Sequence, residues 1–196
     1  MAVMSDAPTI ALFAKYPRAG EAKTRLAPLL GLAGAAEIHR RLVERTLMTM
    51  RESDLPFSVH YTGASADDFA RWLGDDVPLV EQGEGDLGAR LARVPGPAIV
   101  LGADIPGLTA SHLRDAAKAL ESVPVVIGPA SDGGYYLLGF REQSRALWRG
   151  MSWGTHTVLQ ETETRLHSLG LPYSKLGVLD DCDRPEDLAN WPELLS

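Results

Sequence analysis

The sequence lacks several features that are typical of disulfide-rich, zinc-binding, membrane or secreted proteins. Its single cysteine, Cys182, excludes an internal disulfide framework and a zinc site built on several cysteines. No apolar run approaches the roughly 20 residues of a membrane-spanning helix, so we expect no membrane span. Residues 1–8 lack the basic-then-apolar pattern of a signal peptide, which predicts a cytoplasmic location.

Basic residues are also in deficit. The chain has 19 lysines and arginines against 26 acidic residues, which gives a net charge of −7. A generic nucleic-acid-binding protein usually presents a basic face, so this balance argues against nucleic acid as a partner. A small anion remains a possible ligand, because a local cluster of bases is enough to hold one.

The remaining composition is that of an ordinary folded domain. With 196 residues, 45% hydrophobic and 23% charged, the chain is long enough to bury a sizeable core. It has no repeat of 20 to 50 residues, no low-complexity tract and no Ser/Pro-rich linker. We therefore expect one domain over residues 1–196, whose sequence gives no indication of an oligomeric state.

Short apolar runs alternate with helical patterns along the chain. The predicted strands are residues 9–14, 57–62, 77–80, 98–101, 123–127, 135–140 and 173–179. The predicted helices are residues 35–50, 66–73, 87–94, 111–120, 157–169 and 185–195, the last interrupted by Pro192. This alternation predicts an α/β fold with a mostly parallel sheet. The two strands without a helix between them, 123–127 and 135–140, predict one antiparallel element in a mixed sheet.

Ligands of such sheets bind beyond the carboxyl ends of the strands, so the loops there carry the candidate sites. The loop after the first strand contains Lys15, Arg18, Lys23 and Arg25, with Gly20 among them. Glycine permits close backbone approach, and Lys and Arg suit phosphate oxygens. The alternative is a solvated basic loop. The spacing is not that of a P-loop.

Acidic residues follow two other strands. Asp104 follows the buried run 98–101 and is placed to hold a divalent cation, which prefers carboxylate oxygens. It is equally well explained as a turn or capping acid. Asp180, Asp181 and Asp183 repel one another unless a cation or base lies between them. Alternatively, Asp183 caps the following helix while Asp181 or Asp180 faces a site.

Two glycine-containing loops complete the candidate regions. Gly133 and Gly134 suit a tight hairpin turn, preceded by Asp132 as a turn acid or a functional carboxylate. The loop 82–88, Gln-Gly-Glu-Gly-Asp-Leu-Gly, follows another predicted strand and would allow a base or ribose to approach.

Taken together, these segments resemble the small bacterial glycosyltransferase-like proteins of the DUF2064 group. That group includes enzymes of arsenosugar biosynthesis and transferases associated with radical-SAM proteins. The resemblance begins with residues 13–28, Phe-Ala-Lys-Tyr-Pro-Arg-Ala-Gly-Glu-Ala-Lys-Thr-Arg-Leu-Ala-Pro. It continues in order through residues 82–90, 102–106, 132–136 and 181–188, and so spans nearly the whole chain.

The resemblance implies a GT-A fold of the nucleotide-diphospho-sugar transferase class: a Rossmann-like three-layer sandwich with a mixed, mostly parallel sheet. It also implies a nucleotide held by the first loop and a divalent metal, Mg²⁺ or Mn²⁺. The chain is similar as well to 2-phospholactate guanylyltransferases, which transfer a nucleotidyl group. Asp104 lacks the second Asp of the usual GT-A Asp-x-Asp motif, so a second metal ligand is expected from Asp183 or Asp181.

The same resemblance assigns roles to individual residues. The expected nucleotide-binding residues are Ala14, Lys15, Gly20, Lys23, Arg25, Gln82, Asp86 and Gly88. The expected metal ligands are Asp104, Asp183 and Asp181. The expected acceptor-side residues are Gly133, Gly134, Tyr135 and Trp153, with Asp132 as general base. Asp104, Asp132 and Lys23 are the residues expected to take part in catalysis.

The leading hypothesis is a metal-dependent glycosyltransferase that uses a nucleotide-sugar donor and a small-molecule acceptor. The clustered bases of the first loop favour a triphosphate, which keeps open a nucleotidyltransferase that releases pyrophosphate. A non-catalytic nucleotide-binding module is the third possibility, since fold does not imply function. The clustered carboxylates argue against it, because binding alone does not need them.

Overall fold

The computed structural model describes residues 7–195, which form a seven-stranded mixed sheet. The strand order is β3-β2-β1-β4-β6-β5-β7, and among these strands β6 alone runs antiparallel to its neighbours. The strands are β1 (Thr9–Lys15), β2 (Phe57–Thr62), β3 (Leu79–Glu81), β4 (Ala98–Leu101), β5 (Val125–Pro129), β6 (Tyr135–Phe140) and β7 (Tyr173–Lys175). The predicted α/β fold with one antiparallel element is confirmed.

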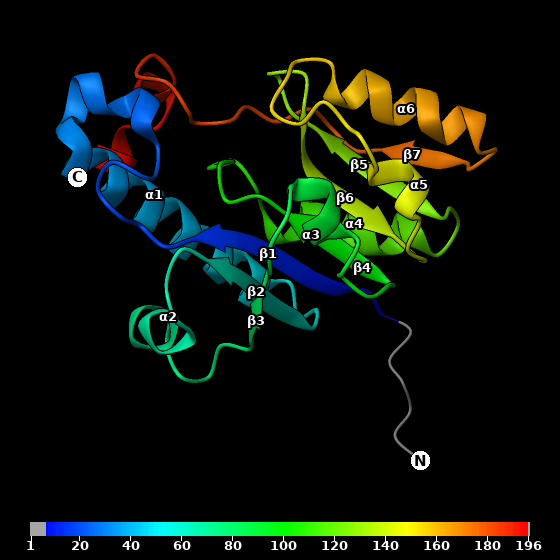
Figure 1. The fold of residues 1–196 in the computed structure, drawn as a ribbon, viewed down its shortest axis with the longest axis horizontal. Helices are drawn as coiled ribbons and strands as arrows, with labels where there is room; N and C mark the ends of the chain where they lie inside the picture. Colours follow the sequence, from blue (N-terminus) through cyan, green and yellow to red (C-terminus); the bar gives the residue numbers. More distant parts are fainter. Residues whose placement is uncertain (1–6, 196) are drawn as a thin grey trace.

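Helices cover both faces of this sheet and make three layers (Figure 1). One face packs against α1 (Ala27–Glu52), α2 (Ala66–Leu73) and α4 (Ala110–Leu120). The other face packs against α3 (Leu87–Leu91), α5 (Arg145–Trp148) and α6 (Val158–Ser168). Three short 3₁₀ helices complete the description: η1 (Thr24–Leu26), η2 (Asp187–Asn190) and η3 (Pro192–Leu195).

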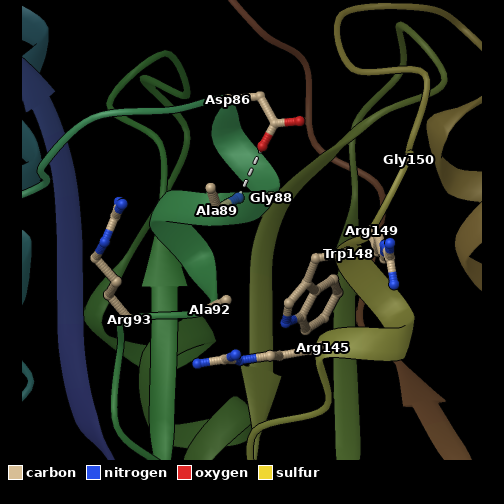
Figure 2. Close-up of a pocket in the computed structure, with 9 residues that line it drawn as sticks. All are labelled: Asp86, Gly88, Ala89, Ala92, Arg93, Arg145, Trp148, Arg149 and Gly150. Carbon is tan, nitrogen blue, oxygen red and sulfur yellow. Dashed lines mark hydrogen bonds between the residues drawn. The ribbon is translucent and has the colours of Figure 1, made fainter.

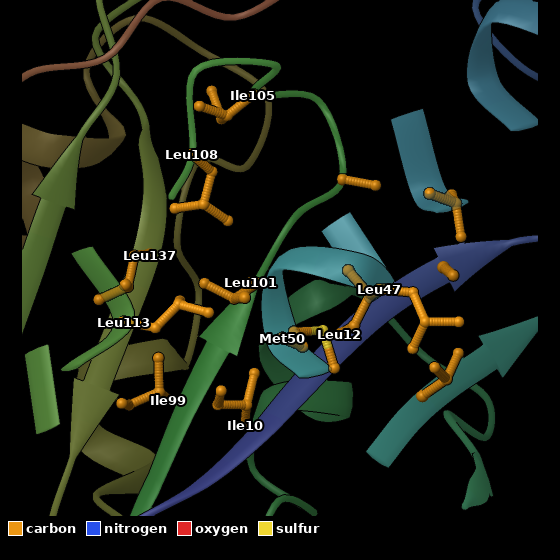
Figure 3. Close-up of a cluster of buried hydrophobic side chains, with 14 of the residues drawn as sticks. Ile10, Leu12, Leu47, Met50, Ile99, Leu101, Ile105, Leu108, Leu113 and Leu137 are labelled. Atoms are coloured by element: carbon orange, nitrogen blue, oxygen red, sulfur yellow. The ribbon is translucent and has the colours of Figure 1, made fainter. Parts of the chain in front are cut away.

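Alternation along the strands separates the two apolar layers. Ile10 and Leu12 of β1 point into the layer shared with α1, while Ala11 points into the opposite layer. In the first layer, Leu47 and Met50 of α1 pack over the sheet, as Figure 3 shows. Burial of these side chains is the main favourable term that fixes the helices to the sheet, at roughly 25 cal/mol per Å² of apolar surface removed from water.

A third apolar cluster ties the end of the described chain to the first helix. After β7 the chain crosses the molecule to α1, seen as the orange-to-red segment in Figure 1. There Cys182 and Leu188 pack against Leu26 and Ile38, and all four side chains are buried. We call residues 180–195 the C-terminal strap, because this packing fixes its position against the loop that precedes α1.

Several element boundaries differ from the sequence prediction. The predicted helix 185–195 is wrong: η2 and η3 are 3₁₀ turns, and Pro192 begins the second of them. The strand predicted over 173–179 ends at Lys175, and α5 was not predicted. Helix α1 extends the predicted segment 35–50 toward its N-terminus and is kinked at Gly31, whose φ is +71°.

Helix α2 begins with a capping box at Ser65. Its hydroxyl accepts from the Asp68 backbone N–H, and the Asp68 carboxylate accepts from the Ser65 backbone N–H. No helix in residues 7–195 is long and apolar enough to cross a membrane. The signal-peptide interpretation of residues 1–8 concerns mainly residues 1–6, which lie outside the described part.

Candidate active site

The buried ammonium of Lys23 is the centre of an ionic cluster at the carboxyl edge of the sheet. Its Nζ lies 2.8 Å from Asp104 Oδ1 and 3.3 Å from Asp183 Oδ1, and its side chain is 3% exposed. The backbone of Lys23 is in the left-handed region, with φ of +49°, immediately before η1. The first loop therefore brings a lysine to the two acidic turns that follow β4 and β7.

The second base of the cluster is Arg25, whose Nη1 binds Asp183 Oδ2. Asp183 thus offers one oxygen to each base. Its own backbone N–H donates to Asp187 Oδ2 at 2.9 Å, and so does the N–H of Arg184 at 2.7 Å. The capping role considered for Asp183 is therefore wrong: Asp187 accepts from the turn, and Asp183 faces the bases.

A backbone hydrogen bond joins the two acidic turns directly. The N–H of Cys182 donates to the carbonyl of Asp104 at 2.8 Å. The turn after β4 and the C-terminal strap are thus held together beside Lys23. The expected convergence of Asp104 and Asp183 is present in the structure, with the lysine ammonium as the cation between them.

Charge pairing sets the ionisation of this cluster. Burial lowers the pKa of Lys23, but the attraction of Asp104 and then of Asp183 outweighs burial, so the pKa is raised above its usual value. Burial raises the pKa of Asp183, but Lys23 and Arg25 outweigh it, so that pKa is lowered. Both groups therefore stay charged over the physiological pH range.

Asp181 differs from its neighbour in having no base close to it. Its pKa is raised, first by burial and then by the negative charges of Asp132, Asp187 and Asp183. Because the charge of Asp132 affects the pKa of Asp181, the β5–β6 turn lies near the strap. Asp181 is therefore the carboxylate whose ionised form is least favoured here, and a cation would relieve that repulsion.

The carboxylates can be tested against the metal expected from the sequence. In the described part, no three His, Cys, Asp or Glu side chains gather closely enough to form a metal cage by themselves. Mg²⁺ does not need one, since it usually takes one or two carboxylates together with water and phosphate. Asp104 fits that role: its side chain is 51% exposed, and one oxygen is left over after the pairing with Lys23. Both oxygens of Asp183 are already paired with bases.

The start of the first loop lies at the end of β1. Lys15 Nζ is 3.3 Å from a carboxylate oxygen of Glu21, and Gly20 turns the loop with φ of +82°. Beneath it, Nε2 of the buried His39 lies 2.9 Å from the Lys15 carbonyl oxygen. Sequence reasoning missed His39, because a histidine inside a helical pattern is usually a surface residue.

The expected base-binding residue Gln82 is buried and holds the carboxyl edge together. Its Nε2 donates to the carbonyl of His60 at 2.7 Å and, at 3.4 Å, to that of Ala14. Its Oε1 accepts from Arg90 Nη1 at 2.9 Å. The side-chain amide is thus hydrogen-bonded to β1, β2 and α3, and Gln82 holds these elements together at the carboxyl edge of the sheet.

Asp86 and Gly88 belong to the beginning of α3. Asp86 caps the helix, with Oδ1 accepting from the Ala89 N–H at 2.8 Å. Gly88 is buried against α5: a Cβ at this position would lie 2.5 Å from the carbonyl oxygen of Trp148. The geometry therefore gives Asp86 a capping role and Gly88 a packing role, and their predicted contacts with a nucleotide stay a prediction.

The β5–β6 connection is the tight turn expected from its glycines. Asp132 Oδ1 accepts from the Gly134 N–H at 2.8 Å. Gly133 has a φ of +88°, and a Cβ there would lie 2.2 Å from the His156 carbonyl oxygen. Asp132 remains exposed at the tip of this turn, so its second oxygen is open to solvent.

Tyr135 and Trp153, expected on the acceptor side, pack with the apolar layer below α6. The Tyr135 hydroxyl is buried, and burial raises its pKa well above the usual range. The Trp153 indole nitrogen is buried and has no hydrogen-bond partner within residues 7–195. The structure does not bring these two side chains to the Lys23 cluster.

Known proteins of similar sequence and structure are transferases. A 2-phospho-L-lactate guanylyltransferase of Methanosarcina mazei is 26% identical over 179 residues, which cover 88% of this chain and 81% of that protein. A crystal structure from Desulfovibrio desulfuricans G20, assigned provisionally as a nucleotide-diphospho-sugar transferase, is 30% identical with a TM-score of 0.87. That match covers 94% of this chain and 85% of the other.

A more distant structure shares the fold alone. Rv0371C of Mycobacterium tuberculosis H37Rv, solved as a complex with manganese, is 20% identical with a TM-score of 0.54 over 95% of this chain and 98% of that one. The family "Uncharacterized protein conserved in bacteria (DUF2064)" matches residues 46–155, which contain Gln82, Asp104 and Asp132. This match covers more than half of the 196 residues, and the chain belongs to the DUF2064 family.

Proposed function

We propose that this protein is a metal-dependent transferase that acts on a nucleotide donor, with residues 1–196 working as one domain. The observation that carries the proposal is the cluster of Lys23, Asp104 and Asp183 at the carboxyl edge of β1 and β4. A base beside a half-exposed carboxylate suits a donor whose phosphates need both a metal and a lysine. The transferase relatives described above support this proposal.

In this proposal the donor phosphates lie over the first loop. Lys23 and Arg25 contribute positive charge, and Lys15 lies at the end of β1 on the same loop. Asp104 holds the metal with its remaining oxygen, while Asp183 orients the two bases. Mg²⁺ or Mn²⁺, when bound, adds positive charge against the donor phosphates. These contacts accelerate transfer because the negative charge on the leaving phosphate grows in the transition state.

The acceptor side is assigned to the turn of Asp132. Its exposed carboxylate would take the proton from an acceptor hydroxyl as that oxygen attacks the donor. Asp181, whose pKa is raised partly by the charge of Asp132, offers a second carboxylate nearby. A small-molecule acceptor is proposed, because transfer to a small hydroxyl compound needs only these local groups.

Glycosyl transfer from a nucleotide sugar is the leading form of the reaction. One likeness that covers most of both chains, at a TM-score of 0.87, is to a protein assigned provisionally to the nucleotide-diphospho-sugar transferases. Nucleotidyl transfer is the second candidate, favoured by the guanylyltransferase relative and by the four bases of the first loop. The two differ in which donor bond breaks, and therefore in the product released.

The experiment is a product analysis with a matched pair of variants. Purified protein is incubated with nucleoside triphosphates and with nucleotide sugars, in Mg²⁺, in Mn²⁺ and in excess chelator. Release of a nucleoside diphosphate identifies glycosyl transfer, and release of pyrophosphate identifies nucleotidyl transfer. Asp104→Asn is expected to slow the reaction by at least about a hundredfold, because it removes the metal's carboxylate.

Asp75→Asn is the control, since Asp75 is exposed and the substitution removes the same charge elsewhere. An unchanged rate in Asp104→Asn, or full activity in chelator, would remove the proposed metal role. Nucleotide binding without any turnover, independent of metal, would instead identify a binding module.

A further inference from the structure

A pocket of about 350 Å³ lies between α3 and α5, on the face of the sheet opposite α1. Figure 2 shows Arg93 on the α3 side, and Arg145 and Arg149 on the α5 side. Its volume is at the lower end of the range of small-molecule sites. None of its three arginines belongs to the candidate active site.

The charge in this pocket is unbalanced. Within residues 7–195, the side chains of Arg145 and Arg149 have no hydrogen bond or ion pair. Arg93 makes one bond, from Nη1 to the backbone carbonyl of Gln82 at 3.1 Å. Asp86 is the one carboxylate among the lining residues, and one of its oxygens already caps α3. An excess of positive charge is therefore held at one place in a protein whose net charge is −7.

Arg145 and Arg149 are exposed, and their spacing adds a small repulsion that an anion would relieve. Arg145 and Arg149 are four residues apart and flank one turn of helix, the spacing at which like charges repel. The nearby Arg165 differs, since Glu161 neutralises it. An anion between the arginines of α5 and Arg93 would remove the repulsion.

One wall of the pocket is closely packed, whereas Arg145 and Arg149 lie at its exposed rim. Trp148 is 1% exposed and lines one wall, with its indole nitrogen bonded to Gln143 Oε1 at 3.0 Å. Gly88 faces it without a side chain, and a Cβ there would collide with the Trp148 carbonyl. Small residues on α3, Gly88, Ala89 and Ala92, leave the space that the arginines surround.

We propose that this pocket is a binding site for a phosphorylated small molecule. Guanidinium groups present paired N–H donors that match the oxygens of a phosphate group, and they remain charged at all physiological pH values. Two arginines without partners and a third with one bond supply enough donors for a dianionic or more highly charged group. The Ala89 and Ala92 wall accommodates the carbon part of such a ligand. Its arginines are not the bases proposed to hold the donor phosphates, although Asp86 and Gly88, which are expected to contact a nucleotide, also line it.

The test follows the indole ¹H–¹⁵N signals of the four tryptophans during a titration with inorganic pyrophosphate. Trp148 lines the pocket, whereas Trp72 lies in α2 and donates to Glu44 of α1, and Trp191 lies in the strap. We expect the Trp148 signal to shift saturably, with half-saturation at or below roughly 1 mM at about 0.15 M salt. Unmoved Trp72 and Trp191 signals show that the fold is intact.

Variants separate this site from the donor loop. In Lys15→Gln/Arg25→Gln the Trp148 shift should persist, because the pocket arginines are unchanged. In Arg145→Gln/Arg149→Gln the half-saturation concentration should rise at least about tenfold. The control Lys118→Gln/Arg114→Gln removes two positive charges from the exposed face of α4. It should leave the half-saturation concentration unchanged. Arg149→Gln alone provides a milder second variant.

Three results would overturn the proposal. The first is a Trp148 signal that does not move up to roughly 10 mM pyrophosphate. The second is an equal shift in wild type and Arg145→Gln/Arg149→Gln. The third is an equal weakening by the α4 control, which would identify nonspecific attraction. Because the donor-loop variant is measured separately, failure here leaves the proposed transferase activity untouched, and the reverse also holds.

Discussion

The Nζ of Lys23 lies 2.8 Å from Asp104 Oδ1, and this ion pair joins the loop after β1 to the turn after β4. The lysine side chain is almost fully buried while the aspartate is half exposed. The pair is therefore open to solvent on one side only. It places a positive charge where a donor phosphate would arrive, already held in position by carboxylates.

Replacing Lys23 by methionine should lower the free energy of unfolding by about 1–3 kcal/mol, below the range for a fully buried pair because Asp104 is half exposed. The change leaves Asp104 and Asp183 facing each other without the base between them. Urea unfolding of Lys23→Met measures the loss. Arg18→Gln, at an exposed position with a 3.9 Å pair, is the control and should change little. Equal stability of wild type and Lys23→Met would contradict the prediction.

Gln82→Leu should destabilise the protein by about 1–3 kcal/mol, although leucine is similar in size. The substitution leaves the His60 carbonyl and the Arg90 guanidinium without the partners they have now, in a buried place. Chemical denaturation provides the measurement. Gln160→Leu on the exposed side of α6 is the matched control. If the two variants lose equally little stability, Gln82 does not hold the edge as described.

Gly88→Ala should cost about 1–3 kcal/mol, because its Cβ would lie 2.5 Å from the Trp148 carbonyl oxygen and α5 would have to move. Gly102→Ala is the matched control: a Cβ at that position meets nothing within 4 Å. There the lower entropy of the unfolded chain can even raise stability. Thermal or urea unfolding of both variants compares them, and a similar loss in each would show that packing at Gly88 is not tight.

Stability should fall as the pH decreases from about 7 toward 5. Burial lowers the pKa values of His39 and His60 below the ordinary 6.5. The unfolded chain therefore binds protons that the folded chain does not, and the stability present above pH 6.5 is lost as the pH falls toward the depressed values. His39→Gln, which keeps a donor for the Lys15 carbonyl, should flatten this dependence in urea midpoints measured across the range. A slope identical to that of wild type would exclude His39 as a contributor.

The fold was largely predictable because buried strands appear in the sequence as short runs of apolar residues. The run 98–101 is apolar throughout, and β4 is buried at every position. The residues at which helices and strands begin and end were less predictable, because tertiary contacts determine them. The strap residues Leu188 and Leu194 lie in two separate 3₁₀ turns, each packed against α1, with Pro192 starting the second turn.

The convergence of the cluster residues was predictable from their positions, but the directions of their side chains were not. The sequence places Lys23, Asp104 and Asp183 after strands that share an edge, and the structure brings them together. Nothing in the spacing indicates that Lys23 would lie between the two carboxylates. Tyr135 and Tyr136 illustrate the same limit, since alternation along β6 sends the two adjacent rings into different layers and only the register decides which.

The strap has a consequence for the order in which the protein is made. Lys23 leaves the ribosome 160 residues before Asp183, the acid that orients it. A nascent chain halted before the strap can form much of the sheet, but its first loop lacks both Asp183 and the Cys182 contact to the Asp104 turn. The complete ionic cluster around Lys23 therefore forms only after residues 182 and 183 have been made.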